Sequence, residues 1–233
     1  MIRHCTYTND CMTISAQLCH DTALKYGCNE STIYRYDDLD KSFRAKNSEV
    51  LSIELGAGLW IWKVQVCLQE LQKCDPGDYV VYTDGGVEFV NSIGFLINAM
   101  DEPVMLFQNQ WWHHEWCKGD ALHAGQVKQL QASCMIFKAC YESLEFVNTW
   151  KNLCEIPHLI DDTPSKLPNH PDFQEHRRDQ SLLTAAQLFY GYKGHWWPAE
   201  YLNGKFCYPK NPGQTDTYPI IFHHHRKRNH EWE

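Results

Sequence analysis

The clearest candidate for chemistry in the sequence is an acidic residue that directly follows a buried strand. Residues 79–82 (YVVY) form a continuous apolar run typical of a strand covered on both faces, and Asp84 comes just after it. Ligands of open parallel sheets bind beyond the carboxyl ends of strands, where a carboxylate can coordinate a cation that bridges a diphosphate, or can bind a ribose. Gly85 and Gly86 would let the backbone approach a bulky ligand closely. The same three residues are equally typical of a plain turn.

A second polar segment, 176–181 (HRRDQS), precedes Leu182 and Leu183 at a predicted helix start. An acid and an amide, Asp179 and Gln180, stand there beside three potential cations, and the helix dipole favours a carboxylate at this position. Such a pair can bind or activate a sugar hydroxyl. The alternative is an ordinary helix cap, in which Asp179 caps the helix and the basic side chains are solvated.

The third candidate segment is the basic run 223–226 (HHHR) near the end of the sequence. Imidazoles can ligate a metal ion, and an arginine can hold phosphate. Runs of surface histidines also occur without any such role. Both interpretations stay open from the sequence.

Strands that alternate with helices are expected to position these three segments. Apolar patterns and turn residues predict strands at 2–7, 31–36, 79–82, 104–107 and 130–137, and helices through 14–23, 59–71, 90–100, 142–153 and from about Asp179. Loops are expected at 111–116, rich in tryptophan and histidine, and at 157–172, rich in proline and aspartate. This order predicts one α/β domain over residues 1–233, a three-layer sandwich with a mainly parallel central sheet.

The composition is that of an ordinary globular domain, with 43% apolar and 21% charged residues among 233. The net charge of −8 argues against a nucleic-acid partner, because such proteins neutralise phosphates with clustered lysines and arginines. Nine tryptophans and twelve tyrosines exceed what a core of this size requires. The surplus suits a cleft that stacks on sugars or bases, although core packing accounts for many of these rings.

The first ten residues lack the apolar core of a secretory signal, and no stretch has about 18 uncharged apolar residues in a row. The eleven cysteines show neither a CxxC zinc pattern nor a complete pairing scheme, which favours reduced and mostly buried thiols. We therefore expect a cytoplasmic protein without a transmembrane segment.

Four segments together make the sequence resemble a known family. Residues 56–63 (GAGLWIWK), 77–86 (GDYVVYTDGG), 115–120 (EWCKGD) and 176–183 (HRRDQSLL) occur in this order. They are similar to patterns of small GT-A glycosyltransferases of bacteria and large DNA viruses, in which G-x-G-Y-W-x-W-K-P, D-x-x-x-Y-x-D-A-G and H-R-x-D-Q-S recur. The resemblance runs from about Thr6 to the His-Arg-x-Arg-Asn segment at 225–229, nearly the whole chain.

The resemblance implies a GT-A (Rossmann-like) fold and the transfer of a sugar from a nucleotide diphosphate, with UDP as the expected nucleotide, to a glycan or glycoprotein hydroxyl. Asp84 stands in the place of the DxD motif, which commonly holds Mn²⁺ or Mg²⁺ against the donor diphosphate. His224 or His225 is the expected third metal ligand, and Arg226 is expected near the phosphates.

The resemblance also assigns a donor site. Thr6 and Tyr7 would touch the base, and Lys63 would reach the diphosphate. The residues expected to contact the donor are Thr6, Tyr7, Trp60, Lys63, Asp84, Gly85, Gly86, Arg177 and Arg226.

Two positions depart from the family's pattern. Gly86 replaces the second acid of the DxD motif, so Asp84 is the one assured carboxylate, with Glu88 as the nearest further acid. Val64 replaces the proline that follows the Trp-Lys pair, a change expected to alter only the helix start.

Two reaction geometries remain open. In an inverting transfer, a carboxylate accepts the acceptor's proton while the acceptor oxygen attacks from the face opposite the leaving diphosphate; in a retaining transfer, attack comes from the same face. Asp179 is the expected base in the first case, and Asp120 and Glu115 are the other acids in motif segments. In the second case Asp179 and Gln180 would lie beside the anomeric carbon.

Three other functions fit parts of this pattern. One is a metal-dependent nucleotide-sugar hydrolase that uses water as the acceptor. Another is a non-catalytic sugar-nucleotide-binding module, which would not need the acids Glu115, Asp120 and Asp179. The last is a scaffolding protein, which would not need four polar motifs near strand ends. Within the transferase interpretation, hexosyl and pentosyl donors both remain open.

Overall fold

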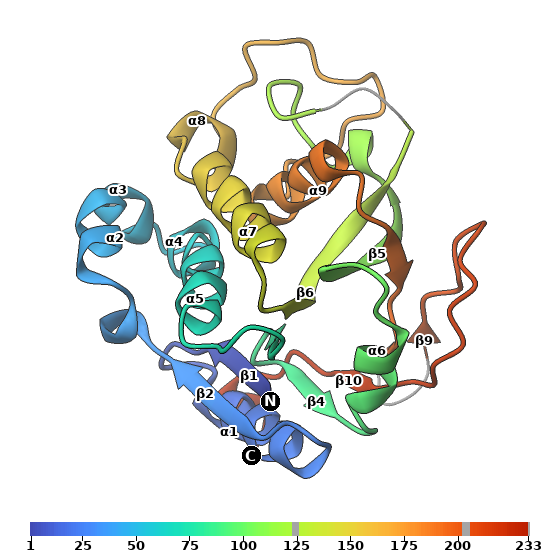
Figure 1. The fold of residues 1–233 in the computed structure, drawn as a ribbon. Coiled ribbons are helices and arrows are strands. Elements are labelled where there is room, and N and C mark those ends of the chain that lie inside the picture. The colour runs from blue at the N-terminus through green and yellow to red at the C-terminus, as the bar shows by residue number, and fades with distance from the viewer. Residues whose placement is uncertain (123–125, 202–205, 233) are drawn as a thin grey trace.

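A six-stranded sheet forms the centre of the protein (Figure 1). The computed structural model describes residues 1–122, 126–201 and 206–232. The strands lie in the order β2 (Glu30–Tyr34), β1 (Ile2–Tyr7), β3 (Tyr79–Thr83), β6 (Lys128–Lys138), β5 (Val104–Trp112) and β7 (Gly194–Trp196). Strand β6 is antiparallel to both of its neighbours, and the other three pairings are parallel. The mainly parallel sheet predicted from the sequence is therefore confirmed.

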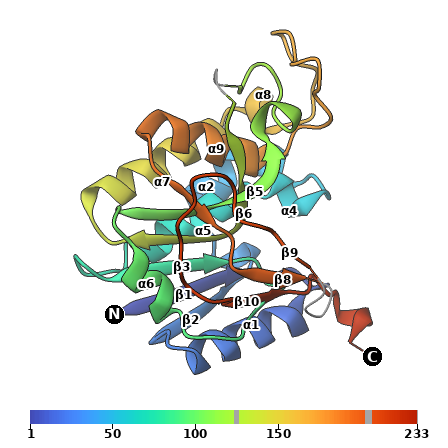
Figure 2. The same cartoon turned by 90° about the vertical axis from the view of Figure 1, so that its right-hand side faces the viewer.

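Apolar side chains cover both faces of this sheet, because neighbouring residues of a strand point to opposite sides. On one face Val80 and Tyr82 belong to the cluster that lies under α5 (Trp62–Leu71), α7 (Tyr141–Cys154) and α9 (Arg178–Tyr190). On the other face Val81 belongs to a separate cluster with residues of α1 (Thr13–Lys25) and α6 (Gly94–Ala99). Figure 2 shows these helices on opposite sides of the strands, as a three-layer sandwich requires.

A second, smaller sheet lies on the α1 side. Its strands are β4 (Val87–Phe89), β10 (Phe222–His224), β8 (Ala199–Tyr201) and β9 (Phe206–Cys207), in that order. Strand β10 is antiparallel to β4, with His224 opposite Val87. The basic run near the end of the sequence is thus part of a sheet, and this pairing carries it to the loop that holds Asp84.

The remaining elements are short. They are α2 (Lys41–Lys46), α3 (Ser48–Leu51), α4 (Gly56–Leu59), α8 (Pro157–Ile160) and the 3-10 turns η1 (Tyr36–Asp38), η2 (His113–Glu115) and η3 (Asn229–Glu231).

Two expectations of local structure were wrong, both where a strand pairs with a distant segment. The helix expected at 90–100 is only α6, because β4 pairs with β10 and the Val90 N–H donates to the Ile221 carbonyl at 2.8 Å. The loop expected at 111–116 begins later, because β5 stays paired with β6 as far as Trp112 and Lys128. Long-range pairing overrides the local pattern in both places.

Two further features bear on the class of protein. No helix in the described part of the chain combines the length and the apolar character needed to cross a membrane. The eleven cysteines are all free thiols, most of them buried.

Candidate active site

The centre of the site is a buried lysine on α5 that contacts two carboxylates. Lys63 is 3% exposed, and its Nζ lies 3.2 Å from Oδ1 of Asp84 and 3.0 Å from Oδ2 of Asp179. Its ammonium group also donates to the main-chain carbonyl of Ala132 on β6 at 2.9 Å. Burial acts to lower the pKa of Lys63, but the two carboxylates outweigh it and raise that pKa. The positively charged side chain of Lys63 therefore links Asp84, at the end of β3, to Asp179, at the start of α9.

An unusual backbone turn fixes where α5 begins. Residues 56–60 all have positive φ angles, among them the non-glycine residues Leu59 (53°) and Trp60 (61°). The Trp60 ring lies where a side chain on Gly56 would be, 2.4 Å from its Cβ position. The indole of Trp62 donates to the Gly56 carbonyl at 2.9 Å. Left-handed backbone is costly for residues other than glycine, so the contacts of Trp60 and Trp62 with Gly56 help to stabilise this turn.

Asp84 lies at the carboxyl end of β3, as its sequence position predicts. About 29% of its side chain is exposed, and Oδ1 accepts a hydrogen bond from the Tyr82 hydroxyl at 2.7 Å. Burial acts to raise the pKa of Asp84, but Lys63 and the Tyr82 hydrogen bond outweigh it and hold that pKa below its usual value. Asp84 is therefore an ionised carboxylate with a surface left for a ligand.

Asp179 lies in the first turn of α9 and is 4% exposed. Burial raises its pKa to about 6, although the Lys63 ammonium acts in the opposite direction. Asp179 is not the cap residue of the helix: its side chain is paired with Lys63, and Arg177 at the cap position makes no side-chain cap bond. A carboxyl that titrates close to neutral pH has the acidity expected of a general base.

Gln180 connects Asp179 to a cavity. Its Nε2 donates to Oε1 of Gln129 at 2.8 Å, and its Oε1 accepts from the Ala132 N–H at 3.4 Å. The cavity has a volume of about 190 Å³. It is lined by Asn109, Trp111, Trp116, Gln129, Gln131, Arg177, Gln180, Tyr208 and Arg226.

The cavity walls combine aromatic rings with amides. Trp111 meets Trp116 and Tyr208 edge to face, with ring centroids 6.4 Å and 5.5 Å apart. The Arg177 guanidinium lies 4.5 Å from the centre of the Trp116 ring. Flat apolar faces beside amide donors and acceptors match the surface of a sugar ring, which is apolar on its faces and carries hydroxyls at its edges.

The segment after β10 is hydrogen-bonded to the loop that follows Asp84. The Gly86 carbonyl accepts from the N–H groups of His225 at 3.0 Å and Arg226 at 3.1 Å. A Cβ atom on Gly86 would lie 2.7 Å from Cα of Arg226. Gly86 thus makes room for the backbone of Arg226, a requirement that the sequence did not predict. A Cβ on Gly85 would be 3.4 Å from the Tyr7 carbonyl oxygen, an ordinary contact.

His224 and His225 have different surroundings. Burial lowers the pKa of His224 to about 3, and the Asp84 carboxylate partly opposes this, so the two groups are within electrostatic reach. Nε2 of His224 accepts from Arg226 Nε at 3.2 Å, while its buried Nδ1 has no hydrogen-bond partner among the described residues. His225 instead accepts from the Lys227 N–H at 3.1 Å and meets the Trp232 ring edge to face.

Asp84 and His224 are the residues of this centre whose chemistry would suit a divalent cation. An ionised carboxylate and a neutral imidazole with a free ring nitrogen are both suitable ligands. Glu88 is not part of this set: it lies on β4, across from His223 on β10, whose Nδ1 is 3.9 Å from its Oε2. Gly86 supplies no side-chain ligand, so the remaining positions would fall to donor and water.

The other residues expected at the donor site lie around this centre. Thr6 is fully buried, and its Oγ1 has no hydrogen-bond partner in the described part of the chain. Tyr7 is also buried and stacks on Trp62, with ring centroids 3.9 Å apart. Trp60 is partly exposed, 5.7 Å from the guanidinium of Arg178. Of these three residues, Trp60 is the one whose side chain is partly exposed.

The acids Asp120 and Glu115 are not brought to the Lys63 centre. Oδ1 and Oδ2 of Asp120 accept from the main-chain N–H groups of Leu167 at 2.9 Å and Lys166 at 2.8 Å, and Oδ2 also contacts His158. Partial burial acts to raise the pKa of Asp120, but these hydrogen bonds outweigh it and keep that pKa well below its usual value. Oε2 of Glu115 accepts from the N–H of Trp112 at 2.9 Å. Both acids hold loops in place.

Sequence reasoning missed the contribution of β6. Gln129, Gln131 and Ser133 alternate along an otherwise apolar strand, and all three are buried. Buried polar residues at every second position point to one face of a sheet, which is a signal of a polar site. Tyr82 and Tyr208 were missed because nothing in their local sequence distinguishes them from core residues.

No family model matches the sequence, and no curated protein sequence matches it. Solved structures of similar fold do exist. The bifunctional glycosyltransferase WbbM has a TM-score of 0.53 and 9% identity over 86% of this chain, which spans 40% of the WbbM chain. Mouse xyloside xylosyltransferase 1 has a TM-score of 0.50 and 11% identity, with 96% of each chain covered. The protein thus has the GT-A-like α/β fold of these glycosyltransferases.

Proposed function

We propose that this chain is a glycosyltransferase that moves a sugar from a nucleotide diphosphate, with UDP as the nucleotide, to a hydroxyl of a glycan or glycoprotein. The observation that carries this proposal is the ion-paired centre of Lys63, Asp84 and Asp179 at the carboxyl end of β3. It lies at the edge of the sheet where open α/β folds bind their ligands. The fold that the chain shares with two glycosyltransferases supports the same activity.

Positive charge near Asp84 suits the donor diphosphate. Arg226 lines the cavity and is bonded through its Nε to His224. Asp84 and His224 would hold Mn²⁺ or Mg²⁺, an ion that supplies charge stabilisation for the leaving diphosphate. Lys63 does not reach the donor in our proposal, because three partners already surround its ammonium group. It holds Asp84 and Asp179 in position instead.

We propose that Asp179 accepts the proton of the acceptor hydroxyl while Gln180 orients the sugar. As the acceptor oxygen bonds to the anomeric carbon, the bond from that carbon to the diphosphate oxygen breaks, and the hydroxyl proton passes to Asp179. A pKa of about 6 leaves this carboxylate mostly ionised at neutral pH and still basic enough to take a proton.

The acceptor would occupy the cavity beside Gln180. Its aromatic walls are Trp111, Trp116 and Tyr208, and its amides can hydrogen-bond to hydroxyls. An aromatic face against a sugar ring together with fixed amides is a common basis of carbohydrate binding.

A panel of nucleotide sugars tested by thermal shift, with and without Mn²⁺, examines the donor half of this proposal. A ligand that binds the folded state raises Tm by mass action. We expect a UDP-sugar to raise Tm in the presence of Mn²⁺, and a panel without any such response would refute the proposal. Product analysis with and without a glycan acceptor then separates transfer from hydrolysis.

A further inference from the structure

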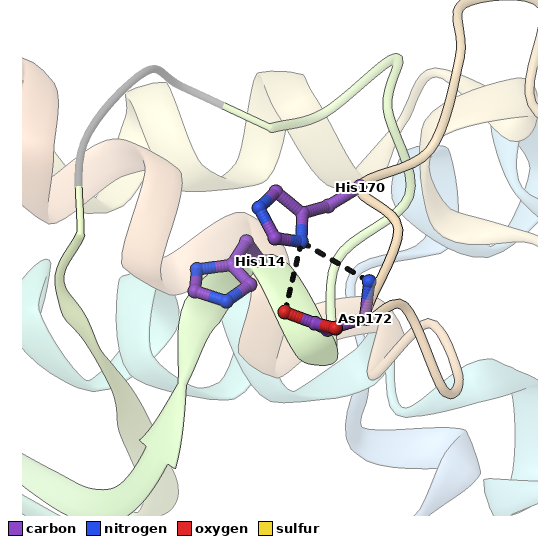
Figure 3. A group of neighbouring side chains, drawn as sticks. All are labelled: His114, His170 and Asp172. Atoms are coloured by element: carbon purple, nitrogen blue, oxygen red, sulfur yellow. Dashed lines mark hydrogen bonds and ion pairs between the residues drawn. The ribbon is translucent and has the colours of Figure 1, made fainter.

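Two histidines and an aspartate lie together on the loop side of the molecule, outside the centre described above (Figure 3). His114 comes from η2, while His170 and Asp172 come from the segment between α8 and α9. One ligand atom of each residue lies within 4.8 Å of the others. We infer that these three side chains form a second metal site, selective for an imidazole-binding ion such as Zn²⁺.

The hydrogen bonding of these residues leaves ligand atoms free. His114 is 8% exposed, and its imidazole makes no hydrogen bond to a described residue. The His170 ring lies against it, with centroids 4.0 Å apart, and Trp112 stacks on it from further away, at 6.3 Å. The ring nitrogens of His114 are not among the fully buried polar atoms, so a ligand or water can reach them.

The segment 170–172 is already folded for binding. Nδ1 of His170 accepts from the Asp172 N–H at 3.2 Å and lies 3.7 Å from Oδ2 of Asp172. Figure 3 shows the His170 ring and the Asp172 carboxylate on the same side, facing His114. An ion would therefore meet ligands that need only small side-chain rotations.

The ligand types decide which ion is preferred. Two imidazoles and one carboxylate suit Zn²⁺, which is commonly held by three protein ligands and one water. Mg²⁺ prefers a shell of oxygens and is a poor match. This preference distinguishes the site from the one beside Asp84 and His224.

The site would join two segments that line the cavity. Next to it, the Gln174 N–H donates to the Glu115 carbonyl at 2.7 Å, and the Arg177 N–H donates to the Trp116 carbonyl at 3.1 Å. Trp116 and Arg177 both line the cavity. An ion bound by His114 and His170 would thus stabilise the two segments that carry Trp116 and Arg177, without lying in the cavity itself.

A second cluster, Asp101, Glu102 and His195, has similar spacing but already contains a cation. Lys193 is paired with Asp101, and its N–H donates to Glu102 at 2.8 Å. It serves as a control, because Glu102→Gln removes one of its carboxylates without touching His170.

The test compares Zn²⁺ binding by the wild type, His170→Ala and Glu102→Gln, followed by calorimetry and thermal shift. His170 is exposed enough that its removal leaves the fold intact, and an unchanged Tm without metal checks this. We expect Zn²⁺ at about 100 times its Kd to raise the wild-type Tm by roughly 5 °C or more. His170→Ala should lose one Zn²⁺ site and this shift, while Glu102→Gln keeps both.

Asp84→Asn adds a further comparison, since it should keep the Zn²⁺ response. Mg²⁺ at the same concentrations should give no response that depends on His170. Equal Zn²⁺ stoichiometry and equal Tm shifts in the wild type and His170→Ala would overturn the inference, as would a wild type that does not bind Zn²⁺.

Discussion

Oδ2 of Asp179 lies 3.0 Å from the ammonium group of Lys63, and both side chains are almost fully buried. Among the described residues, Lys63 has one further carboxylate partner, Asp84, and Asp179 has no other cationic partner. The pair therefore has two roles: the contact that keeps a buried carboxyl ionisable also links a residue of α5 to a residue of α9.

Replacement of Lys63 by methionine tests this connection. It leaves two carboxylates buried near each other without a cation, and breaking a buried pair from one side typically costs about 3–5 kcal/mol. We expect a fall of that size in the free energy of unfolding, measured by urea denaturation at neutral pH, together with loss of donor response. Lys63→Arg keeps the charge but not the shape of the side chain, so its free energy of unfolding should lie between those of the wild type and Lys63→Met. Wild-type stability in Lys63→Met would show that the pair is not structural.

The pKa of Asp179 determines how the stability of the folded protein should depend on pH. Burial raises this pKa to about 6 in the folded protein, compared with about 3.9 for an unfolded aspartate. Because the folded state holds the proton more tightly, this contribution to stability is complete below about pH 4 and is lost as the pH rises through about 6.

Activity should change in the opposite direction, since only the ionised carboxylate can accept a proton. We expect kcat/KM to fall as the pH drops through about 6. A pH profile of the initial rate checks this, and a rate that is constant from about pH 8 to about pH 5 would exclude Asp179 as the titrating group.

Gly85 and Gly86 form a matched pair of substitutions. Gly86→Ala would place a Cβ 2.7 Å from Cα of Arg226, whereas Gly85→Ala would make an ordinary contact at 3.4 Å. Overpacking against backbone typically costs about 1–3 kcal/mol. We expect Gly86→Ala to lower Tm and weaken donor binding, and Gly85→Ala to keep Tm close to wild type. The opposite order in a thermal melt would contradict the packing described here.

His224 and His225 form a second matched pair. Both histidines have a buried ring nitrogen without a hydrogen-bond partner among the described residues, but only His224 is within electrostatic reach of Asp84, whereas His225 packs against Trp232. We expect His224→Ala to abolish the Mn²⁺-dependent part of UDP-sugar binding, and His225→Ala to keep it. Calorimetric titration of the donor with and without Mn²⁺ measures this difference. Equal metal dependence in both variants would remove His224 from the site.

Much of the fold and part of the site could be predicted from the sequence. The apolar run before Asp84 fixed its place at a strand end, and the apolar pair after Gln180 located the start of α9. The joint contact of Asp84 and Asp179 with Lys63 could not be predicted, because the three residues are far apart in the chain and meet only after α5 and α9 pack on the same face.

The surroundings of two other residues could not be predicted for related physical reasons. Asp120 looked like a candidate base because it is an acid in a motif, but the hydrogen bonds that engage it come from residues 158–167. The role of Gly86 depends on a strand near the end of the chain that pairs with β4. Local patterns contain no information on such distant partners.

The central claim is that Asp179 takes the acceptor's proton, and Asp179→Asn tests it most directly. The amide has nearly the same shape but cannot accept the proton, and loss of a general base typically lowers the rate by about 10²–10⁴-fold. Asp120→Asn is the control, because that acid contacts loop amides rather than Lys63. The measurement is the initial rate of sugar transfer, with donor affinity determined on the same samples. We expect Asp179→Asn to bind donor nearly as well as wild type while its turnover falls by at least about 100-fold; turnover within a few-fold of wild type, with donor binding unchanged, would contradict the claim.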